Sequence, residues 1–250
     1  MNPLQAMLLG LVQGLTEFLP VSSSGHLLLF RRLFGLGDMS PAFDVMLHLG
    51  TLAAVIVVLR KDVAETVKSP KKILLLGLAT IPAVAAGLLF GGFIEDVFYS
   101  GNYLWGTFLV TAALLLICEI IEFFRAQKNK PLHPVGIENA AAMGMMQAVA
   151  LLPGLSRSGC TIFGGVVSGA ERRQTATFSF LMSVPVIIGS AILSFGTIDV
   201  GWLPLLVGTA SAFVGGMFAV KLMLCVIGSA NYKWFSLYLL ALSVVSIFIL

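Results

Sequence analysis

The sequence predicts an all-α polytopic membrane protein with six transmembrane helices and two re-entrant helix–turn–helix hairpins, arranged as an inverted-topology repeat. Composition is the first observation, because 58% of the 250 residues are hydrophobic and only 11% are charged. Soluble domains carry about 25% charged residues. Long apolar segments recur along the chain, and two further ones are broken by polar runs. Such a chain cannot cover a surface that faces water, so a bilayer is its expected environment.

The first expected element is a re-entrant hairpin at 3–34, where the run EFLPVSSSGH (17–26) interrupts an apolar stretch. Each half is shorter than the roughly 20 residues that a spanning helix needs, so the chain is expected to enter the bilayer and return. Irregular backbone is tolerated at that depth only where protein surrounds it. Three spans are expected after the hairpin, at 42–60, 73–93 and 103–124.

The same order of elements then repeats. A second hairpin is expected at 136–170, broken by LLPGLSRSGCT, and three spans follow at 174–196, 203–227 and 234–250. The segment VQGLTEFLPVSSSG is similar to MQAVALLPGLSRSG, which supports two repeats within one membrane domain (1–250), at about 1–125 and about 135–250. Because each repeat holds an odd number of spans, the second is expected to be inverted. Broken helices in such repeats mark binding sites.

The distribution of charge predicts an orientation. If each hairpin returns to the side it entered, twelve of the 15 Lys and Arg residues fall on one side and two on the other. The basic side is expected to be cytoplasmic, which places both termini and the first hairpin outside. The N-terminal segment shows no basic region followed by a cleavage site, so we expect no removable signal peptide. The chain has no basic stripe with interleaved aromatic residues, so nucleic acid is not an expected partner. The three cysteines do not have the spacing of a metal site.

The first polar break holds a dense set of candidate functional residues. Gln13 and Glu17 are four residues apart and therefore share one face of the entering helix. The serines Ser22–Ser24 can cap the returning helix. Ser23 and His26 are three apart, so their side chains can meet on its first turn. Free N–H groups at such a helix start favour an anion.

The second polar break complements the first. Arg157 is the only charge in a long apolar stretch, and its guanidinium suits bidentate binding of phosphate. Ser156 is placed to cap the next helix, while Gly159 and Thr161 add small size and a hydroxyl. Together the two breaks offer an arginine, a hydroxyl, a histidine and a carboxylate, a set that suits phosphoryl transfer.

Structural interpretations stand beside this functional one. Ser22 and Ser24 fit helix caps better than direct chemistry. His26 and Glu17 could serve only as buried hydrogen-bond partners, although burying a carboxylate in a membrane is costly. His48 lies in a span without a matching partner and is interpreted as a packed or hydrogen-bonded core residue.

The two breaks also carry a resemblance to a known family. QGLTEFLPVSSSGH (13–26) and PGLSRSGCT (153–161) resemble the two signature motifs of the undecaprenyl-pyrophosphate phosphatase family, also called the bacitracin-resistance family. The resemblance extends over the whole chain. It implies a multi-pass protein of the bacterial inner (plasma) membrane that hydrolyses an isoprenoid pyrophosphate lipid. The products are undecaprenyl phosphate and inorganic phosphate, and the reaction recycles the lipid carrier of cell-wall (peptidoglycan) synthesis.

The resemblance implies that six residues match positions of the family's site, namely Glu17, Ser23, His26, Ser156, Arg157 and Thr161. We expect Ser23, His26, Glu17 and Arg157 to be catalytic, and the substrate phosphate to be bound by Arg157, Ser156, Thr161, Ser22, Gly159 and Gln13. Some family members have glutamate where this chain has Gln13. A divalent cation, Mg²⁺ or Ca²⁺, is expected as cofactor, with Glu17 as its candidate ligand. A homodimer is a further expectation, since small-residue runs can pack helices between chains.

Several mechanisms remain open at this stage. In one, Ser23 attacks the terminal phosphorus with His26 or Glu17 as the base. In another, water attacks directly and Ser23 only binds phosphate. A lipid-phosphate transporter (flippase) could use the same pocket without hydrolysis, because inverted repeats with broken helices are also typical of carriers.

Overall fold

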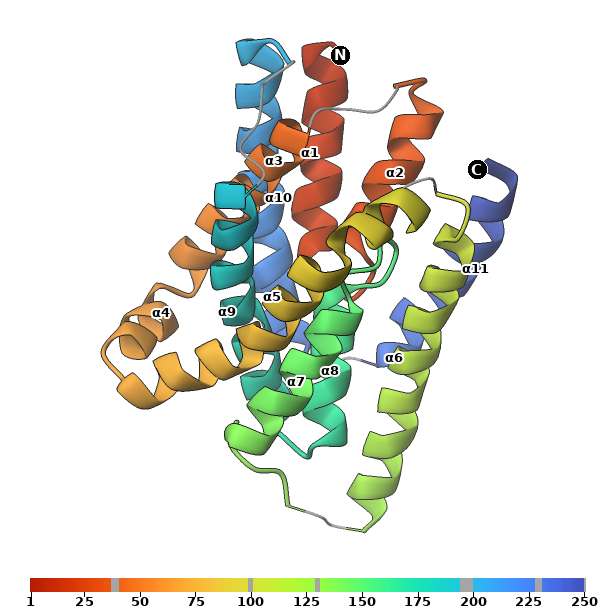
Figure 1. Ribbon diagram of the computed structural model, residues 1–250. Helices are drawn as coiled ribbons and strands as arrows, with labels where there is room; N and C mark the ends of the chain where they lie inside the picture. The colour runs from red at the N-terminus through yellow and green to blue at the C-terminus, as the bar shows by residue number, and fades with distance from the viewer. Residues whose placement is uncertain (37–40, 99–100, 129–130, 194–199, 228–230, 250) are drawn as a thin grey trace.

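The computed structural model describes residues 1–36, 41–98, 101–128, 131–193, 200–227 and 231–249 (Figure 1). In this part of the chain the regular structure is α-helical, apart from one isolated bridge between His133 and Ala170. The all-α fold class is therefore confirmed. The helices are α1 (Pro3–Glu17), α2 (Ser23–Leu33), α3 (Pro41–Val58), α4 (Arg60–Val67), α5 (Pro70–Phe98), α6 (Leu104–Gln127), α7 (Ile137–Val149), α8 (Arg157–Val167), α9 (Arg172–Leu193), α10 (Trp202–Val226) and α11 (Tyr232–Ile249).

The predicted spans coincide with long apolar helices. Among the described residues, α5, α6, α9, α10 and α11 are each long and apolar enough to cross a membrane. Helix α3 becomes the sixth candidate when it is joined to α4, from which it is bent by 85°. The chain is thus a multi-pass helical membrane protein. The ends of two predicted spans, at 194–196 and 250, lie outside the described residues.

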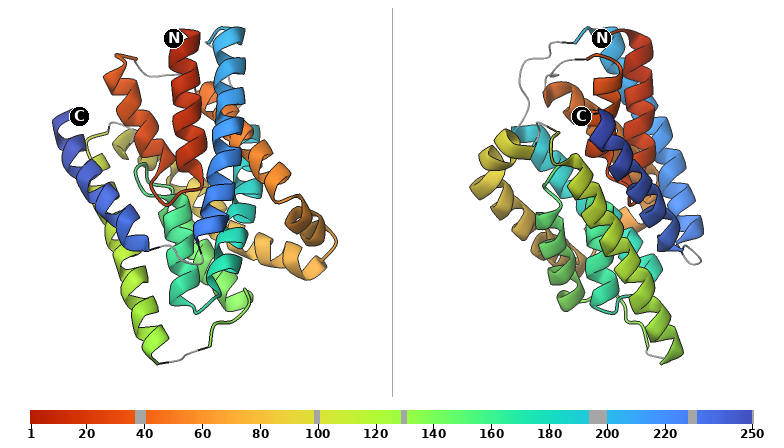
Figure 2. Two further views of the ribbon diagram at one scale, coloured as in Figure 1. Left: turned by 180° about the vertical axis from the view of Figure 1, so that it is seen from behind. Right: turned by 90° about the vertical axis from the view of Figure 1, so that its right-hand side faces the viewer.

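The two predicted hairpins are present as pairs of short helices. In Figures 1 and 2, α1 and α2 come from one end of the molecule, α7 and α8 come from the other, and their turns meet between them. These four helices have 15, 11, 13 and 11 residues. At about 1.5 Å per residue they reach roughly 16–23 Å, less than the ~30 Å hydrocarbon core. Re-entrant insertion therefore stays a prediction that these lengths permit.

Helix pairing follows a regular pattern. Helix α1 packs against α10 and α7 against α5, while α6 contacts α8 and α11 contacts α2. Small residues allow close approaches in two of these pairs. A Cβ atom on Gly14 would lie 2.5 Å from the carbonyl oxygen of Ala212, and one on Gly144 would lie 2.6 Å from that of Ala79. Glycine is required at both positions, as is usual where membrane helices approach closely.

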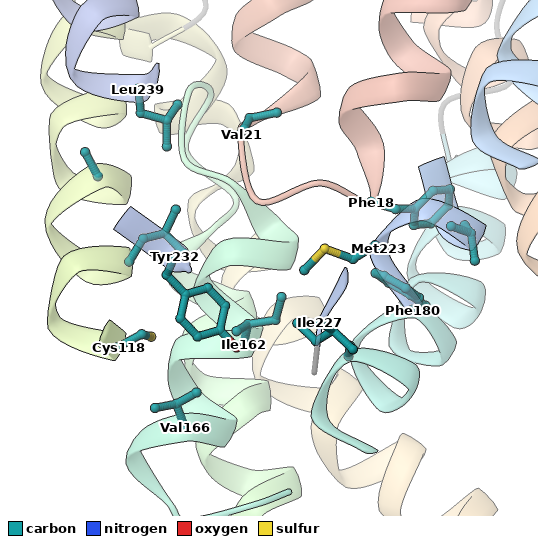
Figure 3. Packing of buried hydrophobic residues seen from close by; sticks show 14 of the residues in the cluster. Phe18, Val21, Cys118, Ile162, Val166, Phe180, Met223, Ile227, Tyr232 and Leu239 are labelled. Atoms are coloured by element: carbon teal, nitrogen blue, oxygen red, sulfur yellow. The ribbon is translucent and has the colours of Figure 1, made fainter. Parts of the chain in front are cut away.

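A hydrophobic core anchors the first turn (Figure 3). Phe18 follows directly after α1 and packs edge-to-face on Phe180 of α9, with ring centroids 5.3 Å apart. Met223 of α10 lies beside this pair in Figure 3, and Tyr232 lies near Ile162. The turn between α1 and α2 is therefore held by buried side chains from the second half of the chain, which fixes the end of α1 in space.

Candidate active site

Glu17 is the centre of the site. It ends α1, its side chain is 6% exposed, and its Oε2 accepts hydrogen bonds from Ser23 Oγ at 2.6 Å and from Gln13 Nε2 at 2.9 Å. A glutamine can donate this bond, whereas an ionised carboxylate could not. Gln13 Oε1 is buried and has no hydrogen-bond partner among the described residues. The Gln13 amide thus orients the Glu17 carboxylate.

Arg157 connects the second hairpin to the first. It is the first residue of α8, and its Nη2 donates to Glu17 Oε1 while its Nη1 donates to the Ser179 carbonyl oxygen at 3.4 Å. The Arg157 side chain is 16% exposed. Because isolated charges at this depth are unfavourable, each member of the pair stabilises the burial of the other.

Further bonds bring the two turns together. Ser158 Oγ donates to the Leu19 carbonyl oxygen at 2.8 Å, and the Gly154 amide donates to Ser24 Oγ at 3.4 Å. These contacts join residues that are 139 and 130 positions apart in the chain. The two polar breaks that the sequence singled out therefore form one site.

Serine caps begin both returning helices. Ser22 Oγ accepts the Gly25 amide at 3.3 Å, and Ser156 Oγ accepts the Gly159 amide at 3.1 Å. Both caps agree with the expectation from sequence. Ser22 has φ +68°, a left-handed conformation that non-glycine residues rarely adopt and that is associated with functional turns. The positive ends of the α2 and α8 dipoles accordingly meet at the site, where they favour an anion.

His26 lies beside the site in a different arrangement from the one expected. Its Nδ1 donates to the Ser22 carbonyl oxygen at 2.6 Å, and in the neutral ring its Nε2 accepts the Tyr238 hydroxyl at 2.6 Å. The Tyr238 and His26 rings are stacked, with centroids 5.7 Å apart. The expected contact between Ser23 and His26 is replaced by the bond from Ser23 to Glu17. Ser23 and Glu17 are brought together by the turn between α1 and α2, and not by a shared face of one helix.

The remaining predicted residue, Thr161, is fully buried. Its hydroxyl hydrogen-bonds to Ser179 Oγ at 2.6 Å and also lies 2.9 Å from the Arg157 carbonyl oxygen. It therefore ties α8 to α9 directly beneath Arg157. Its role in binding phosphate stays a prediction.

Three polar residues at the site were not predicted from the sequence to be functional: His48, Ser179 and Tyr238. His48 Nε2 lies 3.7 Å from Glu17 Oε2, while its Nδ1 donates to the Asp44 carbonyl oxygen at 2.7 Å. The interpretation of His48 as a core residue is therefore incomplete, since its side chain is 31% exposed and lies beside the Glu17 carboxylate. Ser179 and Tyr238 complete the set. Each of the three is a polar side chain within an apolar span, which is the sequence pattern that could have indicated a functional role.

The expected divalent cation has little support from the residues themselves. Within the described ranges, no group of three or more His, Cys, Asp or Glu side chains could hold a metal ion. Both oxygens of Glu17 already accept hydrogen bonds. The divalent cation therefore stays an expectation, with Glu17 as its candidate protein ligand beside the substrate phosphates.

A serine hydrogen-bonded to a buried carboxylate that also pairs with an arginine is a set of groups that can bind and transfer a phosphoryl group, which defines the class of site. Comparison with known proteins agrees with this class. The family model described as "Bacitracin resistance protein BacA" matches residues 6–245, so the chain belongs to this family.

Relatives match over nearly their full lengths. An undecaprenyl-diphosphatase of Carboxydothermus hydrogenoformans is 39% identical, covering 98% of this chain and 96% of the relative. The undecaprenyl-diphosphatase 4 of Bacillus thuringiensis (strain Al Hakam) is 40% identical over 99% and 97%. An undecaprenyl-diphosphatase of Thermosipho africanus is 37% identical over 97% and 98%.

Proposed function

We propose that this protein hydrolyses undecaprenyl diphosphate to undecaprenyl phosphate and inorganic phosphate, and so returns a lipid carrier to cell-wall synthesis. The similar proteins are named for this activity and cover almost the whole chain. The observation that carries the proposal is the hydrogen bond from Ser23 Oγ to Glu17 Oε2, at 2.6 Å, on a carboxylate that also pairs with Arg157. In this proposal Ser23 is the nucleophile, Glu17 is its base and Arg157 is the phosphate-binding cation.

In the proposed first step, Ser23 Oγ attacks the terminal phosphorus while its proton passes to Glu17 Oε2. The bond between that phosphorus and the bridging oxygen breaks, and undecaprenyl phosphate leaves with the electron pair. Glu17 releases the proton to the leaving group or to solvent. Water then attacks the phosphoserine, one proton of the water passes through Glu17 to Ser23 Oγ, and inorganic phosphate departs.

Arg157 has the electrostatic role in this scheme. The substrate brings several negative charges to a guanidinium that otherwise faces Glu17, and planar N–H groups suit phosphate oxygens. The starts of α2 and α8 add their positive dipole ends. These groups stabilise charge on the transferring phosphoryl group, where electrostatic preorganisation has its largest effect.

His26 takes a positioning role in the proposal. Both of its ring nitrogens are engaged, with the Ser22 carbonyl oxygen and the Tyr238 hydroxyl, while Glu17 accepts the Ser23 proton. Of the two candidate bases, Glu17 is therefore the one in contact with the nucleophile. His26 holds the backbone immediately before Ser23.

The test is phosphate release from undecaprenyl diphosphate by purified protein in detergent. Wild type and Arg32→Ala, which alters an exposed arginine at the end of α2, should both release phosphate. Arg157→Ala should lose about 10²–10³-fold in kcat, the loss typical of removing one transition-state donor. A pure carrier would release no phosphate, so an inactive wild type would exclude hydrolysis in favour of transport.

The proposal also covers the orientation of the protein in the membrane. We infer that the site opens toward the outer face of the plasma membrane, because most basic residues lie at the opposite end of the predicted topology. The swapped pairing of α1 with α10 and of α7 with α5 supports the inverted repeat. In a cysteine-free background, Leu33→Cys should react with an impermeant maleimide on intact cells, and Lys128→Cys should not. The reverse labelling would refute this orientation.

A homodimer stays a prediction, to be checked from the mass of the detergent-solubilised protein.

A further inference from the structure

We propose that Tyr238 of α11 is a positioning residue for the nucleophile, and that it acts through His26 on the backbone of Ser22. The inference rests on the proposed hydrolysis with Ser23 as the nucleophile. The Tyr238 hydroxyl donates to His26 Nε2 at 2.6 Å, and His26 Nδ1 donates to the Ser22 carbonyl oxygen at 2.6 Å. Because Ser22 directly precedes Ser23, a continuous path of hydrogen bonds connects α11 to the nucleophile.

Ser22 is the residue on which this path acts, because its backbone is strained. Its φ is +68° and its ψ is 96°, and among the described residues it is the only one other than glycine with a positive φ. Such a conformation persists only where surrounding contacts hold it. His26 supplies two of these contacts, since its backbone amide also donates to the Ser22 carbonyl oxygen, at 3.3 Å. Without them, Ser22 would relax and turn Ser23 away from Glu17.

The imidazole of His26 needs a second anchor to hold Ser22 in this way. A carbonyl oxygen can only accept, so Nδ1 carries the proton and Nε2 of the neutral ring is an acceptor. His26 is 3% exposed, and a buried acceptor without a donor is unfavourable. The Tyr238 hydroxyl is that donor, and its stacked ring, with centroids 5.7 Å apart, limits rotation of the imidazole. Tyr238 therefore fixes the direction of the bond from Nδ1 to Ser22.

Packing alone does not account for a tyrosine at this position. Tyr238 is 46% exposed, at the edge of the bundle where α11 lies in Figures 1 and 2. Buried hydroxyls hold α11 against α6 on either side of it. Ser236 Oγ donates to the Ala112 carbonyl oxygen at 2.8 Å, and Ser243 Oγ donates to that of Trp105 at 2.7 Å. These two bonds fix the position of α11 along α6, and with it the place of the phenol hydroxyl.

Three substitutions separate positioning from packing. Tyr238→Phe keeps the ring and removes only the hydroxyl. Ser22→Gly removes the strain, because glycine adopts a positive φ readily and is also accepted as an N-cap. Tyr103→Phe is the matched control, because it makes the same change at a tyrosine that is 51% exposed at the start of α6.

The experiment measures kcat and KM for undecaprenyl diphosphate, together with the rate of phosphoenzyme formation by rapid acid quenching, for the purified proteins in one detergent. Tyr238→Phe should lower kcat and the rate of phosphoenzyme formation by roughly three- to tenfold, as expected for one lost hydrogen bond, with KM within about twofold of wild type. Made in the Ser22→Gly protein, the same substitution should lower both rates by a smaller factor, because no strain remains to be held. Tyr103→Phe should match wild type.

Three results would overturn the inference. The first is a Tyr238→Phe protein that forms the phosphoenzyme at the wild-type rate. The second is an equal or larger loss in the Ser22→Gly protein, because Tyr238 would then only stabilise the packing of α11. The third is phosphate release by wild type without a phosphoenzyme, which would exclude Ser23 as the nucleophile but leave the proposed hydrolysis intact. A wild type that releases no phosphate would instead refute the proposed function, and this inference with it.

Discussion

Replacing Glu17 by glutamine removes both of the roles proposed for this carboxylate, those of base and of counter-charge to Arg157. The substitution keeps the size of the side chain but removes the proposed base, which accepts a hydrogen bond from Ser23 Oγ at 2.6 Å. General-base catalysis contributes about 10²–10⁴-fold, equivalent to roughly 3–5 kcal/mol of transition-state stabilisation. The same change leaves the Arg157 guanidinium, 16% exposed, without its counter-charge. Breaking a buried ion pair from one side destabilises a protein by about 3–5 kcal/mol.

A double variant distinguishes these effects. Glu17→Gln combined with Arg157→Gln removes both charges, so the thermal midpoint should recover toward wild type while hydrolysis stays abolished. Glu138→Gln, an exposed glutamate in the first turn of α7, is the matched control and should behave as wild type. The assays are kcat from phosphate release and unfolding monitored by tryptophan fluorescence in one detergent. A Glu17→Gln enzyme within tenfold of wild-type kcat would refute the assignment of Glu17 as the base.

Four further outcomes are expected. Ser23→Ala should abolish the phosphoenzyme trapped by acid quenching of labelled substrate, and full activity without the hydroxyl would favour direct attack by water. Tyr238→Phe keeps the stacked ring but loses the hydrogen bond to His26, so kcat should fall up to about tenfold, corresponding to roughly 0.5–1.5 kcal/mol. Gly144→Ala places a Cβ 2.6 Å from a carbonyl oxygen of α5 and should lower stability by about 1–3 kcal/mol, whereas Gly106→Ala, which meets open space, should not. EDTA should reduce phosphate release if a divalent cation accompanies the pyrophosphate, and unchanged rates would remove that expectation.

Hydrophobic length was sufficient to predict the spans, because a helix must match the thickness of the bilayer whatever its neighbours are. It could not reveal α4, since Arg60–Val67 is short and polar and its helix depends on the bend after α3. The pairing of α1 with α10 was also hidden, because the small residues that allow it are common in every apolar helix.

The site too was predictable in part from the sequence. Polar runs identified both turns, and Arg157 stood out as an intramembrane charge. The sequence left both His26 and Glu17 open as partners of Ser23, because spacing rules apply within one helix, whereas Ser23 and Glu17 face each other across a turn. Contacts between distant segments, such as His26 with Tyr238 at a separation of 212 residues, leave no local pattern in a single sequence.

The Glu17–Arg157 pair has a consequence for biogenesis, because its members are 140 residues apart. A nascent chain that has delivered the first hairpin to the membrane holds a carboxylate whose counter-ion has not yet been synthesised. That half cannot settle into its final geometry until α8 is inserted, and a truncated product that ends before Arg157 contains no active centre. Catalytic competence therefore reports that translation and insertion of both halves are complete.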